Sequence, residues 1–232
     1  MIYVTGDTHG NIDFLKLKNP IYKNLTKQDY VIIAGDCGVL FFEDEKEKMI
    51  EAYSNLPFTV LFVDGNHENF TLLNNYPIEE WHGGKIHRIS DSVLHLMRGQ
   101  IFEIDGMKFF TFGGALSIDK MFRTPYSTWW PEEMPTEEEL EEGIKNLEKY
   151  HFEVDYVITH DCPLSLLTTV LLYSSKGSSY KMSPAKSNEF LELLANRITC
   201  KQWFFGHYHI DQYFGKQYTA LYKKVLLIED EN

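Results

Sequence analysis

The sequence is poor in the features that mark exported or membrane-bound proteins. It has three cysteines among 232 residues, no apolar run long enough to span a bilayer, and no basic leader followed by a long apolar stretch. An odd, small number of cysteines argues against a disulfide framework. We therefore predict reduced thiols and a cytoplasmic location.

Positive charge is also scarce. The chain has 22 Lys and Arg residues against 34 Asp and Glu residues, which gives a formal net charge of −12. A protein that wraps long nucleic acid usually presents a basic surface, so we do not expect a long nucleic acid tract as a partner. Bound divalent cations can still reverse the field locally where carboxylates cluster.

The remaining composition is that of an ordinary globular protein. Hydrophobic residues make up 44% of the chain and aromatic residues 15%. A chain of this length can bury a sizeable core, and no composition shift marks a linker. We predict one domain over residues 1–232.

The first third of the chain predicts a parallel sheet. Apolar runs over residues 1–5, 30–34 and 58–63 are each closed by glycine, which is typical of strands buried on both faces. The polar stretches between them have room for helices, and residues 43–53 suit one. Right-handed βαβ crossovers then make the strands parallel.

The rest of the chain predicts a mixed architecture. Residues 85–113 contain strand-like runs with Asp105-Gly106 between two of them, which indicates a hairpin. Residues 115–135 show no period and predict a long ordered loop. We expect helices from Thr136, whose spacing to Glu139 forms a capping box, and from Ser183-Pro184 to about Leu194. Further strands are expected at 156–159, 202–205 and within 211–228.

Five short polar blocks each follow a predicted strand. They are Gly6-Asp7-Thr8-His9-Gly10, Gly35-Asp36-Cys37-Gly38, Gly65-Asn66-His67-Glu68, Thr159-His160-Asp161 and Gly206-His207-Tyr208-His209. Ligands bind at the carboxyl ends of strands in open α/β sheets, so these blocks are expected to converge. Imidazole, carboxylate and amide groups suit divalent metals, and seven such ligands are too many for one ion. With one bridging carboxylate they suit two ions, the arrangement used for in-line phosphoryl displacement.

The order of these blocks resembles the calcineurin-like metallophosphoesterase superfamily. That family reads D-x-H, G-D, G-N-H-[DE], H and G-H-x-H, and all five blocks occur between residues 7 and 209. The resemblance implies an α/β (α+β mixed) fold, a four-layer αββα sandwich of two mixed β-sheets flanked by helices. It also implies a hydrolase acting on phosphoric ester bonds by attack of a metal-bridging hydroxide.

The resemblance further assigns roles to single residues. Asp7, His9 and His209 would hold the first metal, Asn66, His160 and His207 the second, and Asp36 would bridge both. His67 matches the family histidine that protonates or hydrogen-bonds the leaving oxygen. Mn²⁺ is the expected ion, and Fe, Ni²⁺, Co²⁺ or Zn²⁺ are alternatives.

Two departures from the Ser/Thr phosphatases of this superfamily bear on the substrate. Val39 and Leu40 stand where those enzymes have an Asp and an Arg, and Asn69 and Phe70 follow the third block where an Arg is usual. The arginine clamp for a monoester dianion and the carboxylate partner of His67 are therefore missing from these positions. We favour a phosphodiester, nucleotide-like or oligonucleotide substrate. A phosphomonoesterase or protein phosphatase is the alternative, and a non-catalytic scaffold is a third reading.

Several residues outside the motifs stay open at this stage. Arg88, Arg98 or Arg123 can supply a clamp from elsewhere, and Arg123 is the best candidate for a substrate-phosphate contact. The aromatics of 115–135 suit either base stacking or packing of the loop on itself. Asp161 is expected to orient a ligand such as His160 or to cap a turn. The 162–182 segment is compatible with a lid, a dimer contact or disorder, and the oligomeric state is not predicted.

Overall fold

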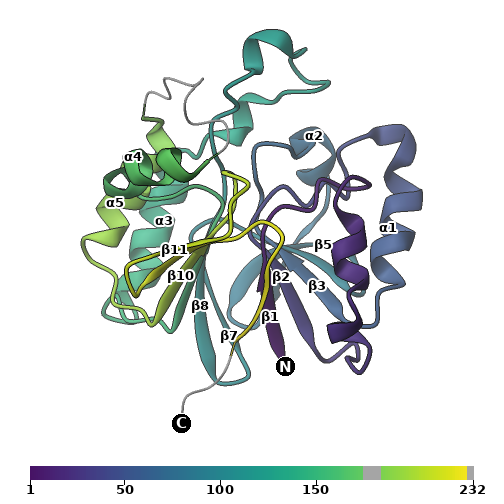
Figure 1. Cartoon of the computed structure of the whole chain (residues 1–232), viewed down its shortest axis with the longest axis horizontal. Helices are drawn as coiled ribbons and strands as arrows, with labels where there is room; N and C mark the ends of the chain where they lie inside the picture. The colour runs from purple at the N-terminus through teal and green to yellow at the C-terminus, as the bar shows by residue number, and fades with distance from the viewer. Residues whose placement is uncertain (175–183, 229–232) are drawn as a thin grey trace.

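A computed structural model describes residues 1–174 and 184–228 of the chain. Its strands form two sheets (Figure 1). The first sheet has the order β13-β1-β2-β3-β6-β5-β4, and the second has the order β11-β12-β10-β9-β8-β7. The strands are β1 (Ile2–Thr5), β2 (Tyr30–Ile33), β3 (Thr59–Phe62), β4 (Ile78–Trp81), β5 (Gly84–Ser90), β6 (Val93–Leu96), β7 (Gln100–Ile104), β8 (Met107–Phe112), β9 (Tyr156–Thr159), β10 (Gln202–Phe205), β11 (Gln212–Phe214), β12 (Tyr218–Ala220) and β13 (Val225–Ile228).

Both sheets are mixed, with a parallel centre and antiparallel edges. In the first sheet β1, β2, β3 and β6 run parallel, while β13 and β5 pair antiparallel to their neighbours. In the second sheet β8, β9, β10 and β12 run parallel, and β7 and β11 pair antiparallel. The predicted Asp105-Gly106 hairpin joins β7 to β8.

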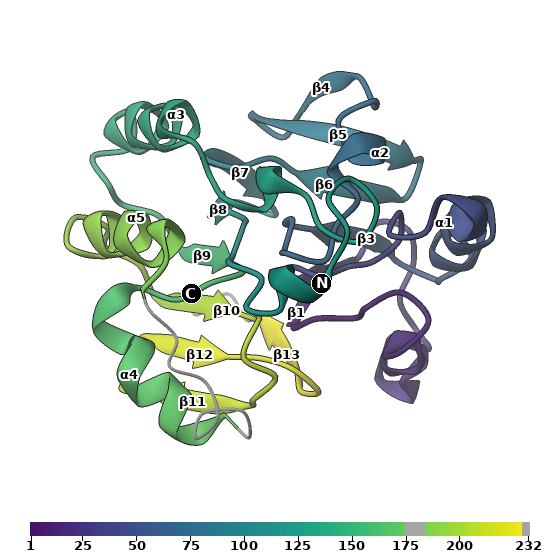
Figure 2. The same ribbon diagram turned by 90° about the horizontal axis from the view of Figure 1, so that it is seen from above.

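Helices cover the outer face of each sheet (Figures 1 and 2). The α-helices are α1 (Lys46–Ser54), α2 (Phe70–Leu73), α3 (Glu137–Glu148), α4 (Leu164–Tyr173) and α5 (Lys186–Ala195). The 3-10 helices are η1 (Phe14–Lys18), η2 (Pro20–Tyr22), η3 (Glu43–Glu45), η4 (Lys120–Phe122) and η5 (Pro131–Glu133). α1 and α2 flank the first sheet, and α3, α4 and α5 flank the second.

The alternation of side chains along each strand produces three apolar layers. In β2, Val31 and Ile33 face the helices, whereas Ile32 points inward. In β9, Val157 likewise faces the helices, and Ile158 points inward, so the inner layer is shared by both sheets. The four-layer αββα sandwich of two mixed sheets is thereby confirmed.

Several local predictions differ from the structure. The crossover from β1 to β2 is built from η1 and η2, because the segment is interrupted by Pro20 and Asn19 caps η2. The helix expected from Ser183-Pro184 begins at Lys186, and Ser183 lies outside the described residues.

The capping box of α3 forms as predicted, with Thr136 Oγ1 accepting from the Glu139 amide at 3.2 Å. No helix among the described residues is long and apolar enough to cross a membrane.

The described residues of the 115–135 and 162–182 segments pack against neighbouring elements. Trp130 is buried against Phe41, and its Nε1 donates to Thr71 at 2.9 Å, so this ring is not available to stack on a base. Tyr126 and Phe122 remain exposed. Within 162–182, α4 packs its Leu167 and Val170 against the second sheet, while residues 175–182 lie outside the described part of the chain.

Candidate metal centre

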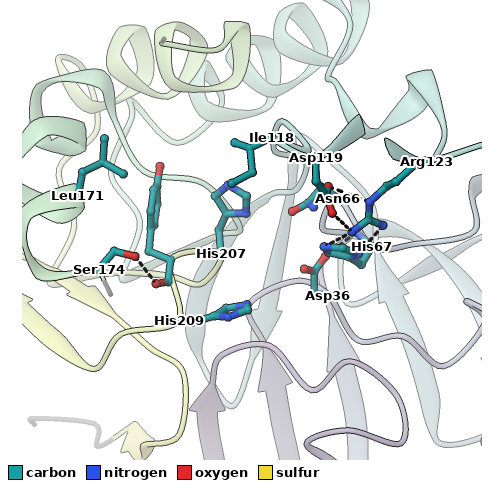
Figure 3. A pocket seen from close by; sticks show the side chains of 11 residues that line it. Asp36, Asn66, His67, Ile118, Asp119, Arg123, Leu171, Ser174, His207 and His209 are labelled. Atoms are coloured by element: carbon teal, nitrogen blue, oxygen red, sulfur yellow. Dashed lines mark hydrogen bonds and ion pairs between the residues drawn. The ribbon is translucent and has the colours of Figure 1, made fainter. Parts of the chain in front are cut away.

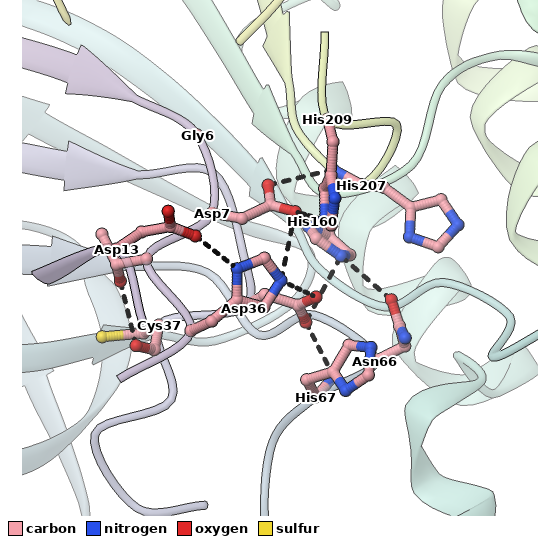
Figure 4. Close-up of polar contacts among 12 residues, drawn as sticks. Gly6, Asp7, Asp13, Asp36, Cys37, Asn66, His67, His160, His207 and His209 are labelled. Atoms are coloured by element: carbon pink, nitrogen blue, oxygen red, sulfur yellow. Dashed lines mark hydrogen bonds and ion pairs between the residues drawn. The ribbon is translucent and has the colours of Figure 1, made fainter. Parts of the chain in front are cut away.

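The polar blocks that follow β1, β2, β3, β9 and β10 meet at one edge of the sandwich. Figure 4 shows Asp7, Asp36, Asn66, His160 and His209 gathered there from both sheets. Parallel pairing carries the carboxyl ends of the strands within each sheet to the same edge, and the two sheets then face each other across it. The sequence-predicted convergence is therefore present in the structure.

The donor atoms form two overlapping groups. Asp7, His9 and His209 make one group, and Asp7, Asp36 and His160 make the other, with the donor atoms of each group within 4.8 Å of one another. His209 Nε2 lies 3.1 Å from Asp7 Oδ2. Asn66 joins the second group, because its Oδ1 lies 3.2 Å from His160 Nε2.

Asp36, a member of the second group, also faces a histidine of the first group. Its Oδ2 is 3.5 Å from His9 Nε2, and its Oδ1 is 3.4 Å from His160 Nε2. The backbone amide of His67 donates to Oδ1 at 2.7 Å, which fixes the carboxylate plane. The two oxygens of this carboxylate therefore face the ring nitrogens of two different histidines.

Outer hydrogen bonds select which ring nitrogen faces the centre. His160 Nδ1 donates to the Ala34 carbonyl at 2.8 Å, and His9 Nδ1 lies 3.0 Å from Asp13 Oδ2. In both rings Nε2 is left pointing at the carboxylates. This is the pattern by which metal-binding histidines are oriented in proteins.

Strained backbone accompanies the donors. His9, Asp36, His207 and His209 have φ of 44°, 50°, 66° and 54°, in the left-handed region that side-chain-bearing residues rarely adopt. Such conformations cost about 1–3 kcal/mol each and persist where the surrounding structure enforces them. Glycine is required at Gly206, because a Cβ there would overlap the Asp7 carboxylate.

Two observations show that the donor set fits divalent cations. Asp7 Oδ2 is buried and makes no hydrogen bond, although an imidazole nitrogen faces it. The buried carboxylates also attract positive charge strongly. Burial lowers the pKa of His9 and of His160, but Asp36 and Asp7 outweigh it and raise these pKa values to about 9 and about 10. A divalent cation supplies the same charge and binds the free carboxylate oxygen.

The family comparison agrees with this geometry. A family model described as calcineurin-like phosphoesterase matches residues 1–211. The chain belongs to the calcineurin-like phosphoesterase family. The match covers every polar block at the centre, so the predicted family and the predicted enzyme class are confirmed. This phosphoesterase is a metal-dependent hydrolase acting on phosphoric ester bonds.

A solved structure has the same fold. Phosphopantetheinyl hydrolase from Mycobacterium tuberculosis is similar to this phosphoesterase with a TM-score of 0.50 and 16% sequence identity. The similarity covers 95% of this chain and 89% of that one. No curated protein matches the chain.

His207 is placed differently from the other predicted ligands of the phosphoesterase. Its backbone amide donates to Asp7 Oδ1 at 3.0 Å, and its ring meets the His160 ring edge-on at a centroid distance of 5.1 Å. Among the described residues its ring belongs to neither donor group. It lines the neighbouring cavity instead (Figure 3). Burial and the adjacent His160 lower its pKa to about 4, so the ring is neutral and able to ligate.

A cavity of about 260 Å³ opens beside the phosphoesterase centre. It is lined by Asp36, Asn66, His67, Ile118, Asp119, Arg123, Leu171, Ser174, His207, Tyr208 and His209. Figure 3 shows Arg123 and His67 together on its wall. Arg123 Nη1 is 3.0 Å from His67 Nδ1, and Asp119 accepts two hydrogen bonds from the same guanidinium, each at 2.8 Å. The 115–135 segment therefore places an arginine on the wall of this cavity.

The other two candidate arginines are engaged elsewhere. Arg88 pairs with Glu79 through Nε at 2.7 Å on β4 and β5. Arg98 is buried, donates to Asp64 Oδ2 from Nε at 2.9 Å and from Nη2 at 2.6 Å, and reaches Glu139 at 3.0 Å. Asp64 precedes Gly65-Asn66, so this ion pair supports the loop that carries a predicted ligand.

Replacing Arg98 with Met should destabilise the phosphoesterase strongly. The change removes the charged partner of the buried Asp64 carboxylate and leaves it with the His95 contact at 3.2 Å, and breaking a buried ion pair typically costs about 3–5 kcal/mol. The free energy of unfolding, measured in urea, should fall by that amount. Arg88→Met is the control, since its pair is partly exposed and is expected to contribute at most about 1 kcal/mol. Equal effects of both substitutions would show that Arg98 has no special structural role.

Sequence reasoning missed several residues that support the donors, and of the two roles expected for Asp161 it is the contact with His160 that the structure does not show. Asp13 lies four residues after His9 and was detectable by that spacing, whereas Ser117 and Tyr222 carry no sequence signal. Ser117 Oγ accepts from Asn66 Nδ2 at 3.1 Å, and the Tyr222 ring stacks on His209 at 4.6 Å. Asp161 does not orient His160, which the Ala34 carbonyl holds. It accepts instead from the Cys162 amide and from Ser187, Asn188 and Tyr208, and so ties α5 to the end of β10.

Proposed function

We propose that this phosphoesterase works with two divalent metal ions, with Mn²⁺ as the expected ion and Fe, Ni²⁺, Co²⁺ or Zn²⁺ as alternatives. Asp7, His9 and His209 would hold one ion, Asn66, His160 and His207 would hold the other, and Asp36 would be shared by both. The position of Asp36 carries the proposal, because its two oxygens face His9 on one side and His160 on the other.

The chemistry of the centre follows from these groups. Divalent ions held by these residues would lower the pKa of water and offset negative charge on phosphoryl oxygens. The buried carboxylates of Asp36 and Asp7 give the centre negative charge, which would attract and hold the cations. His67 lines the adjacent cavity, with its backbone amide on Asp36 and its ring facing solvent-accessible space.

We assign His67 to hydrogen bonding or protonation of the leaving oxygen. Burial lowers the pKa of this ring, Asp36 opposes the shift, and Arg123 adds to it, so the ring is mainly neutral at pH 7. A neutral imidazole has one N–H and one lone pair, and a guanidinium can donate only to the lone pair. Arg123 lies near both ring nitrogens, 3.0 Å from Nδ1 and 3.3 Å from Nε2, and it donates to the one that carries the lone pair. We assign the other nitrogen, with its N–H, to a hydrogen bond with the leaving oxygen, and transfer of a proton would use the imidazolium form.

For the substrate we propose a phosphodiester of nucleotide-like type. The motif arginines that clamp a monoester dianion are absent, and a diester carries less charge on the reacting phosphate. A phosphomonoesterase is the second candidate, and the observation in its favour is Arg123 on the cavity wall. Hydrolysis of bis-p-nitrophenyl phosphate and of p-nitrophenyl phosphate by Mn²⁺-loaded protein tests the choice. A higher kcat/KM for the diester is expected, and a strong preference for the monoester would reject the phosphodiester proposal.

Arg123→Gln should distinguish the two substrate classes further. Asp119 already neutralises part of the Arg123 charge. The kcat/KM of the variant for a diester should therefore fall only roughly threefold. A monoester that uses Arg123 should lose a charge-assisted hydrogen bond worth about 1.5–3 kcal/mol, or roughly 10–100-fold. Lys120→Gln, a neighbouring exposed cation, is the control and should change neither. Loss of metal from Arg123→Gln would contradict its placement outside the centre.

We also propose that the protein is cytoplasmic. Cys37, Cys162 and Cys200 are all unpaired, which suits a reducing compartment. Burial raises the pKa of the Cys37 thiol well above its usual range, so this residue next to Asp36 acts as a small apolar filler.

A further inference from the structure

A second cavity, of about 140 Å³, lies next to the centre but apart from the one that holds Arg123. It is lined by His9, Gly10, Asn11, Ile12, Gly38, Phe41, Phe42, Glu45, Met49 and His67. His67 lines both cavities, and its ring lies 5.8 Å from that of His9. A group attached to an oxygen beside His67 can therefore extend into this second cavity.

The walls of this second cavity are aromatic and aliphatic. Phe41 and Phe42 meet edge to face at 4.8 Å, and Phe41 lies 6.1 Å from the His67 ring. Trp130, which is buried, packs against Phe41 at 6.0 Å and holds this wall in place. Phe42 and Ile12 are 55% and 79% exposed, so their side chains are free to cover an incoming group.

The floor of the second cavity is bare backbone. Gly10 and Gly38 have φ of 56° and 71°, and a Cβ on Gly10 would lie 2.9 Å from the Gly38 carbonyl oxygen. The Gly10 amide donates to the Cys37 carbonyl at 2.9 Å, so the floor offers no unsatisfied donor there. The two glycines therefore allow these two backbone segments to approach each other closely.

The charge around the second cavity selects against anions. Its polar side chains outside the centre are Asn11 and Glu45, which already bond to each other at 2.8 Å. Glu43 and Asp44 precede Glu45 in η3, and no Lys or Arg is among the lining residues. A second phosphate at this position would meet the acidic run, whereas a neutral group would not.

We propose that the second cavity binds a neutral aromatic ring on the leaving side of the substrate. The proposal rests on the phosphoesterase function above and specifies its substrate as an ester whose leaving alcohol carries one flat, uncharged ring. An apolar cavity of about 150 Å³ is known to accept benzene, so the size suits a single ring. Either an aryl alcohol or a pyrimidine nucleoside presents such a ring, while a continuing oligonucleotide is disfavoured by the acidic run.

Direct binding to the Mn²⁺-loaded protein tests the proposal. Calorimetric Kd values are measured for methylphosphonate, phenylphosphonate and the 5′-methylenephosphonate analogue of uridine. Phenylphosphonate, the uridine analogue or both should bind roughly tenfold more tightly than methylphosphonate, and which of them does separates the aryl from the nucleoside source. Phe42→Ala should remove most of this gain, because stacking of a ring on an aromatic side chain is worth roughly a tenfold change in affinity or more.

The controls separate failure of this inference from failure of the proposed function. Phe42 is exposed, so its removal should not affect folding, and methylphosphonate binding should stay within twofold. Phe122→Ala removes an exposed aromatic from the 115–135 segment and should change none of the affinities. Equal binding of all three ligands by a protein that still hydrolyses phosphate esters would overturn the inference alone. If Phe122→Ala also removed the tighter binding of the ring-bearing ligands, the inference would be overturned as well. Absence of binding and of hydrolysis would overturn both.

Discussion

Asp36→Asn should lower kcat/KM for any phosphate ester by at least about a thousandfold. The substitution keeps the shape of the side chain but removes the negative charge that both sets of nitrogens face. If two ions share this carboxylate, both lose a ligand, and a loss of about 4 kcal/mol of transition-state stabilisation corresponds to this factor. Steady-state kinetics at saturating Mn²⁺, with metal content measured in parallel, checks the result.

The comparison variants make the Asp36 prediction specific. His209→Gln removes a ligand of one ion only and should cost less than Asp36→Asn. Asp119→Asn removes a carboxylate from the cavity wall, where it holds Arg123, and should leave the metal content unchanged. If His209→Gln were as damaging as Asp36→Asn, the bridging role of Asp36 would be wrong.

His67→Ala should slow hydrolysis by roughly 10²–10⁴-fold while leaving the metal content intact. Its ring lies on the cavity wall against Arg123, and general acid catalysis contributes an effect of this size. The loss should be largest for esters of alkyl alcohols, whose leaving oxygen needs a proton, and smallest for p-nitrophenyl esters. Rates for a series of leaving groups of increasing pKa measure this dependence as a steeper slope in the variant.

Two results would count against the role of His67. Loss of metal from His67→Ala would make it a ligand instead of a proton donor. An equal loss for every leaving group would indicate that the ring only supports Asp36 through the local backbone. His82→Asn, which changes a histidine on the turn between β4 and β5, is the control and should leave the rates unchanged.

The centre could be predicted because its donors follow strands with strong sequence signals. The runs at 2–5, 30–33 and 59–62 are mostly apolar and are each followed within three residues by glycine, and parallel pairing then places Asp7, Asp36 and Asn66 at one edge. The same argument holds for the blocks after β9 and β10 in the other sheet. That the two edges would face each other came from the family resemblance, since nothing local in the sequence specifies how sheets pack.

The contacts around the centre were less predictable because they join segments without periodic patterns. Arg123 reaches His67 across 56 positions of sequence from a segment whose sequence shows no period, and Tyr222 reaches His209 from the loop after β12. Arg98 was one of three arginines considered for a clamp, with Arg123 preferred, and its buried ion pair with Asp64 explains why Arg98 is occupied elsewhere. Such choices depend on tertiary packing, which single-sequence patterns do not encode.

The number of metal ions per chain tests the central claim most directly. Protein stripped with a chelator is titrated with Mn²⁺, and bound metal and hydrolysis of bis-p-nitrophenyl phosphate are followed together. We predict two ions bound per chain, with full activity reached only when the second is bound, and a lower stoichiometry in Asp36→Asn. Binding of a single ion that restores full activity would contradict the shared role of Asp36, and hydrolysis by metal-free protein would contradict the account as a whole.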